Sequence, residues 1–225
     1  MIIDKTIRLV VFDMAGTVIN EGGIVYDSIH KALQLCGLKV QREEINNWHG
    51  IYKKQVIEHF VKREGISEEE KKVEEVNDKL NSLLKEQYFS EDSSISLIKP
   101  NVLEYFSYLR SNNIKIALNT GYPKDLQELL IDRFDLKDHI DEYISSDEVS
   151  QGRPYPFMIH NLMHKLNIQS VKEVIKVGDS LMDIKEGKNA GCNKSIGVLS
   201  GASCRKDLQD IGADDIIEDI TQLQI

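Results

Sequence analysis

The chain has 225 residues, of which 41% are hydrophobic and 29% are charged, and its formal net charge at pH 7 is −9. This composition is typical of a soluble globular protein and leaves enough apolar residues for an ordinary core. The acidic balance argues against partners such as nucleic acid or an anionic membrane surface. It does not exclude an anionic small substrate, because a bound divalent cation can invert the local field of a carboxylate-rich site.

Neither the cysteines nor the apolar runs indicate an extracytoplasmic protein. Cys36, Cys192 and Cys204 are an odd, widely spaced set, which is neither a disulfide framework nor a zinc cluster. The longest apolar runs are too short to span a bilayer, and no basic segment followed by an apolar stretch marks an export signal. We therefore expect a cytoplasmic protein.

The first part of the chain combines one strand with a long helical stretch. Residues 7–12 are apolar and partly β-branched and end at Asp13, which predicts a buried strand of a parallel sheet. Apolar side chains then recur at helical spacing over residues 24–36 and 52–63, and again after Ser67, which is predicted to form a capping box with Glu70. We expect residues 19–96 to form an all-helical cap domain inserted into a core made of residues 1–18 and 97–225.

From residue 100 onward, strands and helices alternate. The predicted strands cover residues 114–119, 143–145, 174–177, 195–199 and 215–217, and the predicted helices cover 102–109, 125–134, 158–166 and 183–190. This alternation indicates an α/β fold with a Rossmann-like, doubly wound parallel sheet covered by helices on both faces. Such sheets bind ligands at the carboxyl ends of their strands.

Polar residues follow the predicted strands at this edge. They are Asp13; Asn119, Thr120 and Gly121; Gly152 and Arg153; and Gly178, Asp179, Ser180 and Asp183. We expect Asp13 to attack phosphorus in line and to form an aspartyl-phosphate. Thr120 and nearby backbone N–H groups are expected to hold phosphate oxygens, and Arg153 to offset the developing charge. Asp179 and Asp183 supply hard oxygen ligands suited to Mg²⁺.

Taken together, these motifs resemble the haloacid dehalogenase superfamily, and within it the phosphonoacetaldehyde hydrolase (phosphonatase) branch. The matching segments are Phe12-Asp-Met-Ala-Gly-Thr17, Asn119-Thr-Gly-Tyr122, Gly152-Arg-Pro-Tyr-Pro-Phe157 and Val177-Gly-Asp-Ser-Leu-Met-Asp183, with Glu186-Gly187 and Asn189-Ala-Gly191. The resemblance spans essentially the whole chain. It implies a Mg²⁺-dependent hydrolase of small phosphono- or phospho-substrates, and a homodimer formed through the cap helices. It also implies that the Ala15 carbonyl joins the metal ligands and that Gly16, Asn119 and Gly121 join the phosphate-binding residues.

Ala15 and Lys53 set this chain apart from ordinary phosphatases. Phosphatases of the superfamily carry a second aspartate at the position of Ala15, which protonates the leaving alkoxide. The phosphonatase branch instead uses a cap lysine that forms a Schiff base with an aldehyde, so that carbon leaves phosphorus as an enamine. The spacing of Gly50-Ile-Tyr-Lys53 matches the Gly-x-x-Lys motif of that branch, which makes Lys53 the candidate amine.

Several alternatives stay open around Lys53. The chain has His49 and Val56 where the branch has a methionine and a histidine, so His49 or His59 is the expected proton shuttle. Lys54 is either a like charge that lowers the pKa of Lys53 or a solvated side chain. A second hypothesis is a phosphate-ester phosphatase that uses another cap residue or water as its acid. A third is a catalytically idle relative that binds a phospho-metabolite.

Overall fold

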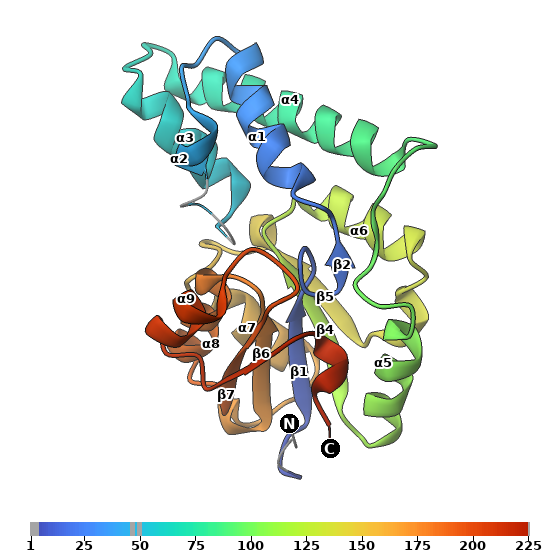
Figure 1. Ribbon diagram of the computed structural model, residues 1–225. Helices are drawn as coiled ribbons and strands as arrows, with labels where there is room; N and C mark the ends of the chain where they lie inside the picture. Colours follow the sequence, from blue (N-terminus) through green and yellow to red (C-terminus); the bar gives the residue numbers. More distant parts are fainter. Residues whose placement is uncertain (1–4, 46–47, 49–50, 225) are drawn as a thin grey trace.

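A parallel sheet forms the centre of the computed structural model, which describes residues 5–45, 48 and 51–224. The sheet has six strands in the order β5-β4-β1-β6-β7-β8 (Figure 1). They are β1 (Leu9–Asp13), β4 (Lys115–Thr120), β5 (Glu142–Ser145), β6 (Val174–Gly178), β7 (Lys194–Val198) and β8 (Asp215–Ile217). Every neighbouring pair is parallel, and the chain winds outward from β1 in both directions. The predicted doubly wound α/β fold is confirmed.

Alternating side chains of the central strand reach the two faces of the sheet. The covering helices are α5 (Val102–Ser111), α6 (Lys124–Arg133), α7 (Phe157–Lys165), α8 (Leu181–Ala190) and α9 (Arg205–Asp210). Val10 and Phe12 of β1 pack in the same cluster as the apolar side chains of α5 and α6. Leu9 and Val11 point the other way and pack in a cluster with those of α7. This period of two places apolar side chains of β1 on both faces of the sheet, and helices cover both faces.

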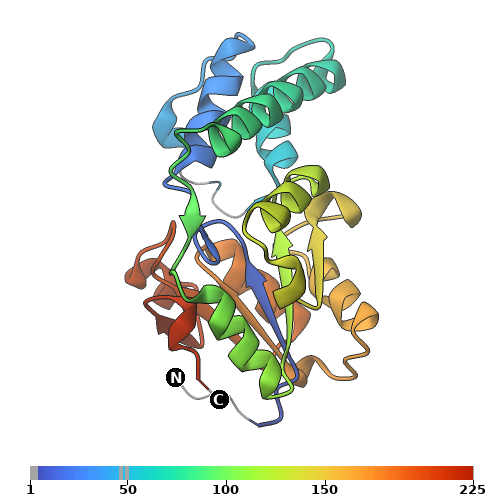
Figure 2. The same cartoon turned by 90° about the vertical axis from the view of Figure 1, so that its right-hand side faces the viewer.

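A layer of helices lies over the carboxyl ends of the strands (Figures 1 and 2). It consists of α1 (Ile24–Leu35), α2 (Arg42–Ile45), α3 (Lys53–Arg63) and α4 (Glu69–Phe89), with α4 packed along both α1 and α3. The two connections to the sheet run side by side, because β2 (Ile19–Asn20) pairs antiparallel with β3 (Ser96–Leu97). The two-stranded ribbon therefore connects the helical layer to the sheet, at the carboxyl ends of its strands.

Some local predictions differ from the structure. Helix α4 begins at Glu69 after Glu68, whose side chain makes no capping hydrogen bond, so the predicted Ser67–Glu70 capping box is wrong. The short elements α2, α9, β2 and β3 were not predicted, because a few residues show no clear periodicity. None of the helices in the described part of the chain is long and apolar enough to cross a membrane.

Candidate active site

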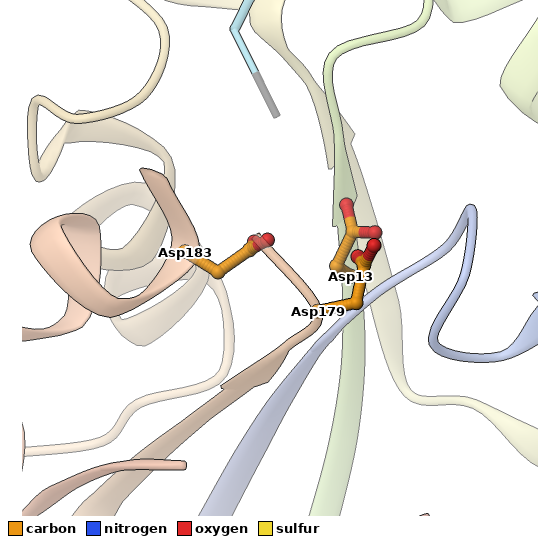
Figure 3. Close-up of side chains that lie close together, drawn as sticks. All are labelled: Asp13, Asp179 and Asp183. Atoms are coloured by element: carbon orange, nitrogen blue, oxygen red, sulfur yellow. The ribbon is translucent and has the colours of Figure 1, made fainter. Parts of the chain in front are cut away.

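Three carboxylates converge at the carboxyl edge of the sheet (Figure 3). Asp13 ends β1, Asp179 follows β6 and Asp183 lies in the first turn of α8. Each offers one oxygen, and the three oxygens lie within 4.8 Å of one another. The turn from β6 into α8 is tight, since a Cβ on Gly178 would lie 2.2 Å from the Asp183 carboxyl carbon. Only glycine at that position allows the carboxylate of Asp183 to lie over the end of the strand.

The electrostatics of this cluster favour a bound cation. Burial raises the pKa of Asp13, and it raises that of Asp179 well above the ordinary value, with repulsion from the other carboxylates adding to both effects. Asp179 accepts a hydrogen bond from the Ala202 N–H at 2.6 Å. A buried set of hard oxygen ligands with mutual repulsion fits a divalent ion such as Mg²⁺.

Arg153 links two members of the cluster. Its side chain is 2% exposed, and its Nη2 donates to Asp13 Oδ1 at 2.7 Å while Nη1 donates to Asp183 Oδ1 at 2.5 Å. Burial opposes its charge, but the surrounding carboxylates outweigh this and raise the pKa of Arg153. A permanent cation therefore lies next to the predicted nucleophile, where it can balance charge on an incoming phosphoryl group.

Behind the carboxylates lies a polar network that the sequence motifs did not reveal. Lys176 is fully buried and donates to Asn119 Oδ1 at 2.7 Å, and it pairs with Asp183 at 2.9 Å. The Asn119 amide in turn donates to both oxygens of Glu186 at 2.9 Å. The predicted phosphate-binding role of Asn119 is therefore not supported by its side chain, which is engaged beneath the site. The signal for this network in the sequence is Lys176 itself, which lies inside the otherwise apolar strand Val174–Gly178. A charged side chain is rarely buried unless it is paired, so a lysine at this position indicates buried partners.

Of the other predicted phosphate-binding residues, two lie at the site and one has a different role. Thr120 and Gly121 line a cavity with Asp13 and Arg153. Gly16 has a φ of +80°, and a Cβ there would lie 2.6 Å from Asp179 Oδ2. Its N–H donates to the Ile19 carbonyl at 2.7 Å and is not free for phosphate. Gly16 is needed for close approach of the backbone, and its phosphate-binding role stays a prediction that its N–H does not support here.

Lys53 reaches the same site from the helical layer. It opens α3, its side chain is buried, and its Nζ donates to the Ile51 carbonyl at 3.3 Å. The amine lies 5.1 Å from the centre of the Tyr26 ring, and a Cβ on Gly121 would be 3.7 Å from it. Lys53 therefore shares with Asp13 and Ala15 a small cavity of about 20 Å³.

The Lys53 amine has an unusual pKa for a lysine. Burial, followed by repulsion from Arg153, lowers the pKa of Lys53 to about 8, against an opposing pull from Asp13 and Glu21. Burial and Arg153, and not a like charge on Lys54, are therefore the main causes of the lowered pKa of Lys53. With a pKa of about 8, roughly a tenth of the amine is neutral at pH 7, far more than for an ordinary lysine, and a nucleophilic lysine reacts through this neutral form.

Of the two expected histidine shuttles, His59 is not among the described residues that line the cavity. His59 is exposed, and its ring centre lies 4.5 Å from that of Trp48. Val56 is fully buried among apolar residues. His49 and Gly50 fall outside the described residues. The described residues that line the cavity include no histidine.

Comparisons with known proteins agree with this geometry. The family model of haloacid dehalogenase-like hydrolases matches residues 10–198. A phosphonoacetaldehyde hydrolase from Bacillus cereus is 30% identical over 205 residues, which cover 88% of this chain and 77% of the relative. One from Latilactobacillus sakei is 29% identical with the same coverage.

Solved structures show the same fold. A phosphonoacetaldehyde hydrolase-like protein from Oleispira antarctica superposes with a TM-score of 0.75 at 21% identity, covering 96% of this chain and 89% of that one. A hydrolase from Pseudomonas syringae superposes with a TM-score of 0.81 at 20% identity, covering 94% of each chain. At these identities the structures support the architecture alone.

Proposed function

Because the chain belongs to the haloacid dehalogenase-like hydrolases, within their phosphonatase-like branch, we propose that it cleaves the carbon–phosphorus bond of a small phosphonate aldehyde. The observation that carries the proposal is the position of Lys53, a buried amine with a pKa of about 8 in one cavity with Asp13. Ala15, which lines the same cavity, has no carboxyl group to protonate a leaving alkoxide. A reaction whose leaving group is activated by an amine fits this pair of features.

The neutral Lys53 amine attacks the aldehyde carbon, and loss of water gives a protonated imine. A carboxylate oxygen of Asp13 then attacks phosphorus while the carbon–phosphorus bond breaks. The electron pair of that bond moves into the imine, which becomes an enamine, and the phosphoryl group stays on Asp13. Protonation of the enamine carbon and hydrolysis of the resulting imine release the shortened aldehyde. Water cleaves the aspartyl-phosphate.

Other site residues bind and orient the phosphonate. Arg153 balances its negative charge beside Asp13, at 2.7 Å from the Asp13 carboxylate. Thr120 and Gly121 border the same cavity and present the loop after β4 to the phosphonate oxygens. Asp13, Asp179, Asp183 and the Ala15 carbonyl would hold Mg²⁺. When bound, the ion supplies positive charge that lets an anionic nucleophile approach an anionic phosphonate.

Residues 19–96 act in this account as a cap domain that opens to admit substrate and closes to bring Lys53 over Asp13. The β2–β3 ribbon supports this, because both connections of the cap run through it. Hinges are proposed near residues 17–22 and 91–98. Hydrogen exchange in these two segments should slow when phosphate and Mg²⁺ are added, whereas unchanged exchange in both would contradict the closure.

Turnover by lysine variants tests the proposal. Lys53→Ala should lose at least ~10³-fold of its activity on phosphonoacetaldehyde, since the covalent step is removed. Lys54→Ala is the matched control, because Lys54 is the next residue on α3 and does not line the cavity, and it should keep its activity. Asp13→Asn should abolish turnover of any substrate. A Lys53→Ala protein that hydrolyses a phosphate ester as well as the unaltered protein does would favour the phosphatase hypothesis instead.

A further inference from the structure

Glu21 is a buried carboxyl group to which the account so far gives no role in the chemistry. It follows β2 directly, and its residue is 8% exposed. One of its oxygens, Oε2, accepts a hydrogen bond from the Val25 N–H in the first turn of α1 at 3.0 Å. This contact supports the start of the helix. Capping alone does not require burial, however, since most capping side chains lie at the surface.

The surroundings of Glu21 connect it to Lys53. Glu21 lines a cavity of about 290 Å³ whose wall also contains Ala15, Tyr26 and Asp179. The same three residues line the smaller cavity that holds Lys53 and Asp13. Glu21 therefore borders the space that adjoins the amine, on the side where Ala15 leaves room for a substrate.

The charges also couple the two groups. Burial raises the pKa of Glu21, and the charge of Lys53 partly offsets this. Glu21 in turn raises the pKa of Lys53. Other charged or titratable groups near Glu21 are Asp27 of α1 and the phenols of Tyr88 and Tyr122. Tyr26, Arg42 and Asp179 line the same cavity as Glu21. Burial thus favours the protonated form of the Glu21 carboxyl, on the wall of a cavity that shares residues with the cavity of the Lys53 amine.

We infer that Glu21 is the acid that removes water from the Lys53 adduct. This inference rests on the proposed function. Attack of the Lys53 nitrogen on the aldehyde forms a carbon–nitrogen bond and, after a proton passes from nitrogen to oxygen, a carbinolamine. The carbon–oxygen bond then breaks, and the hydroxyl group leaves as water with the proton of the Glu21 carboxyl. The carbon–nitrogen double bond forms with positive charge on nitrogen, which the new Glu21 carboxylate faces. In the final hydrolysis the carboxylate takes a proton back from the attacking water.

The other candidates for this proton transfer among the described residues are unsuitable. Ala15 and Val56 carry no titratable group, and His59 is exposed and lines neither cavity. Asp13 is needed as the nucleophile, and Asp179 belongs to the carboxylate cluster. Among the described residues that line the two cavities, Glu21 is the carboxyl that lies outside the cluster.

Glu21→Gln separates the chemical role from the capping role. The glutamine amide oxygen can still accept from the Val25 N–H, so α1 keeps its cap and the variant should unfold at nearly the same temperature. Glu173→Gln is a matched control. Glu173 also accepts a backbone hydrogen bond, from the Ser170 N–H at 3.1 Å, but it lies before β6, at the opposite edge of the sheet.

The experiment measures the rate at which borohydride traps phosphonoacetaldehyde on Lys53, between about pH 6 and about pH 9. Glu21→Gln should slow trapping about 100-fold across this range, and Glu173→Gln should not change it. If Glu21 acted through its charge alone, its loss would lower the pKa of Lys53 further and shift the rise of the trapping rate to lower pH at an unchanged plateau. That result, or rates equal to those of the unaltered protein, would overturn the inference. Failure to trap any adduct in the unaltered protein would instead overturn the proposed function, so the two failures are distinguishable.

Discussion

The hydroxyl groups of Tyr88 and Tyr122 lie 2.7 Å apart and join α4 to the loop after β4. Both phenols are buried, and burial raises the pKa of each well above its ordinary value, so the bond is one between neutral groups. The Tyr122 ring also lies 6.0 Å from the Lys53 amine. The pair therefore connects the helical layer to the core at the wall of the cavity where Lys53 lies.

Tyr88→Phe should destabilise the protein, because it leaves the buried Tyr122 hydroxyl without its partner. We expect a loss of about 1–3 kcal/mol in the free energy of unfolding, measured by urea denaturation. The double variant Tyr88→Phe/Tyr122→Phe removes both hydroxyls and should cost less than the sum of the two single changes. Strictly additive losses would show that the two hydroxyls do not interact.

Mg²⁺ should stabilise the protein against heat, because it binds the folded carboxylate cluster and not the unfolded chain. The midpoint of thermal unfolding should rise with Mg²⁺ concentration, and Asp179→Asn should remove this increase. Burial raises the pKa values of Asp13 and Asp179, so protons compete with the ion and the increase should shrink as the pH falls. An equal rise in Asp179→Asn would place the ion elsewhere.

Arg153→Lys should have a larger effect on kcat than on the free energy of unfolding. Lysine keeps the charge but cannot reach Asp13 and Asp183 together, as the two arms of the guanidinium do. We expect kcat to fall by about 10²–10³-fold, the usual cost of losing one donor to a developing charge. Arg110→Lys, at a half-exposed position that pairs with Asp141, is the control. Steady-state kinetics that leave kcat unchanged in Arg153→Lys would remove Arg153 from the mechanism.

Activity should rise with pH through a group that titrates near 8. Only the neutral amine of Lys53 attacks an aldehyde, and burial lowers its pKa to about 8. Between that value and the ordinary lysine pKa of about 10.4, the unfolded chain binds more protons than the folded protein, so stability should also rise with pH in this window. A profile of kcat/KM against pH tests the first expectation. A rise near the pKa of an ordinary lysine would contradict the environment described for Lys53.

The parallel sheet and much of the site could be predicted from the sequence, because both follow from general rules of strand pattern and sheet topology. Strands of a parallel sheet end at one edge, so polar residues that follow them, such as Asp13, Thr120 and Asp179, were expected to lie together. The carboxylate cluster was predictable in this way. The roles of these residues in catalysis stay predictions.

Other features depend on tertiary contacts that no local pattern encodes. The side chain of Asn119 follows a strand as expected, yet Lys176 and Glu186 engage it beneath the site. The Gly16 N–H is used by a turn. Glu21 is buried although the few residues around it show no periodicity that would indicate burial.

The most direct test of the account is the identity of the residue that forms an imine. The protein is incubated with phosphonoacetaldehyde and Mg²⁺, reduced with borohydride, digested and analysed by mass spectrometry. The account predicts a reduced adduct on Lys53, none on Lys54, and loss of the adduct together with turnover in Lys53→Ala. Turnover of phosphonoacetaldehyde without any adduct on Lys53 would contradict it.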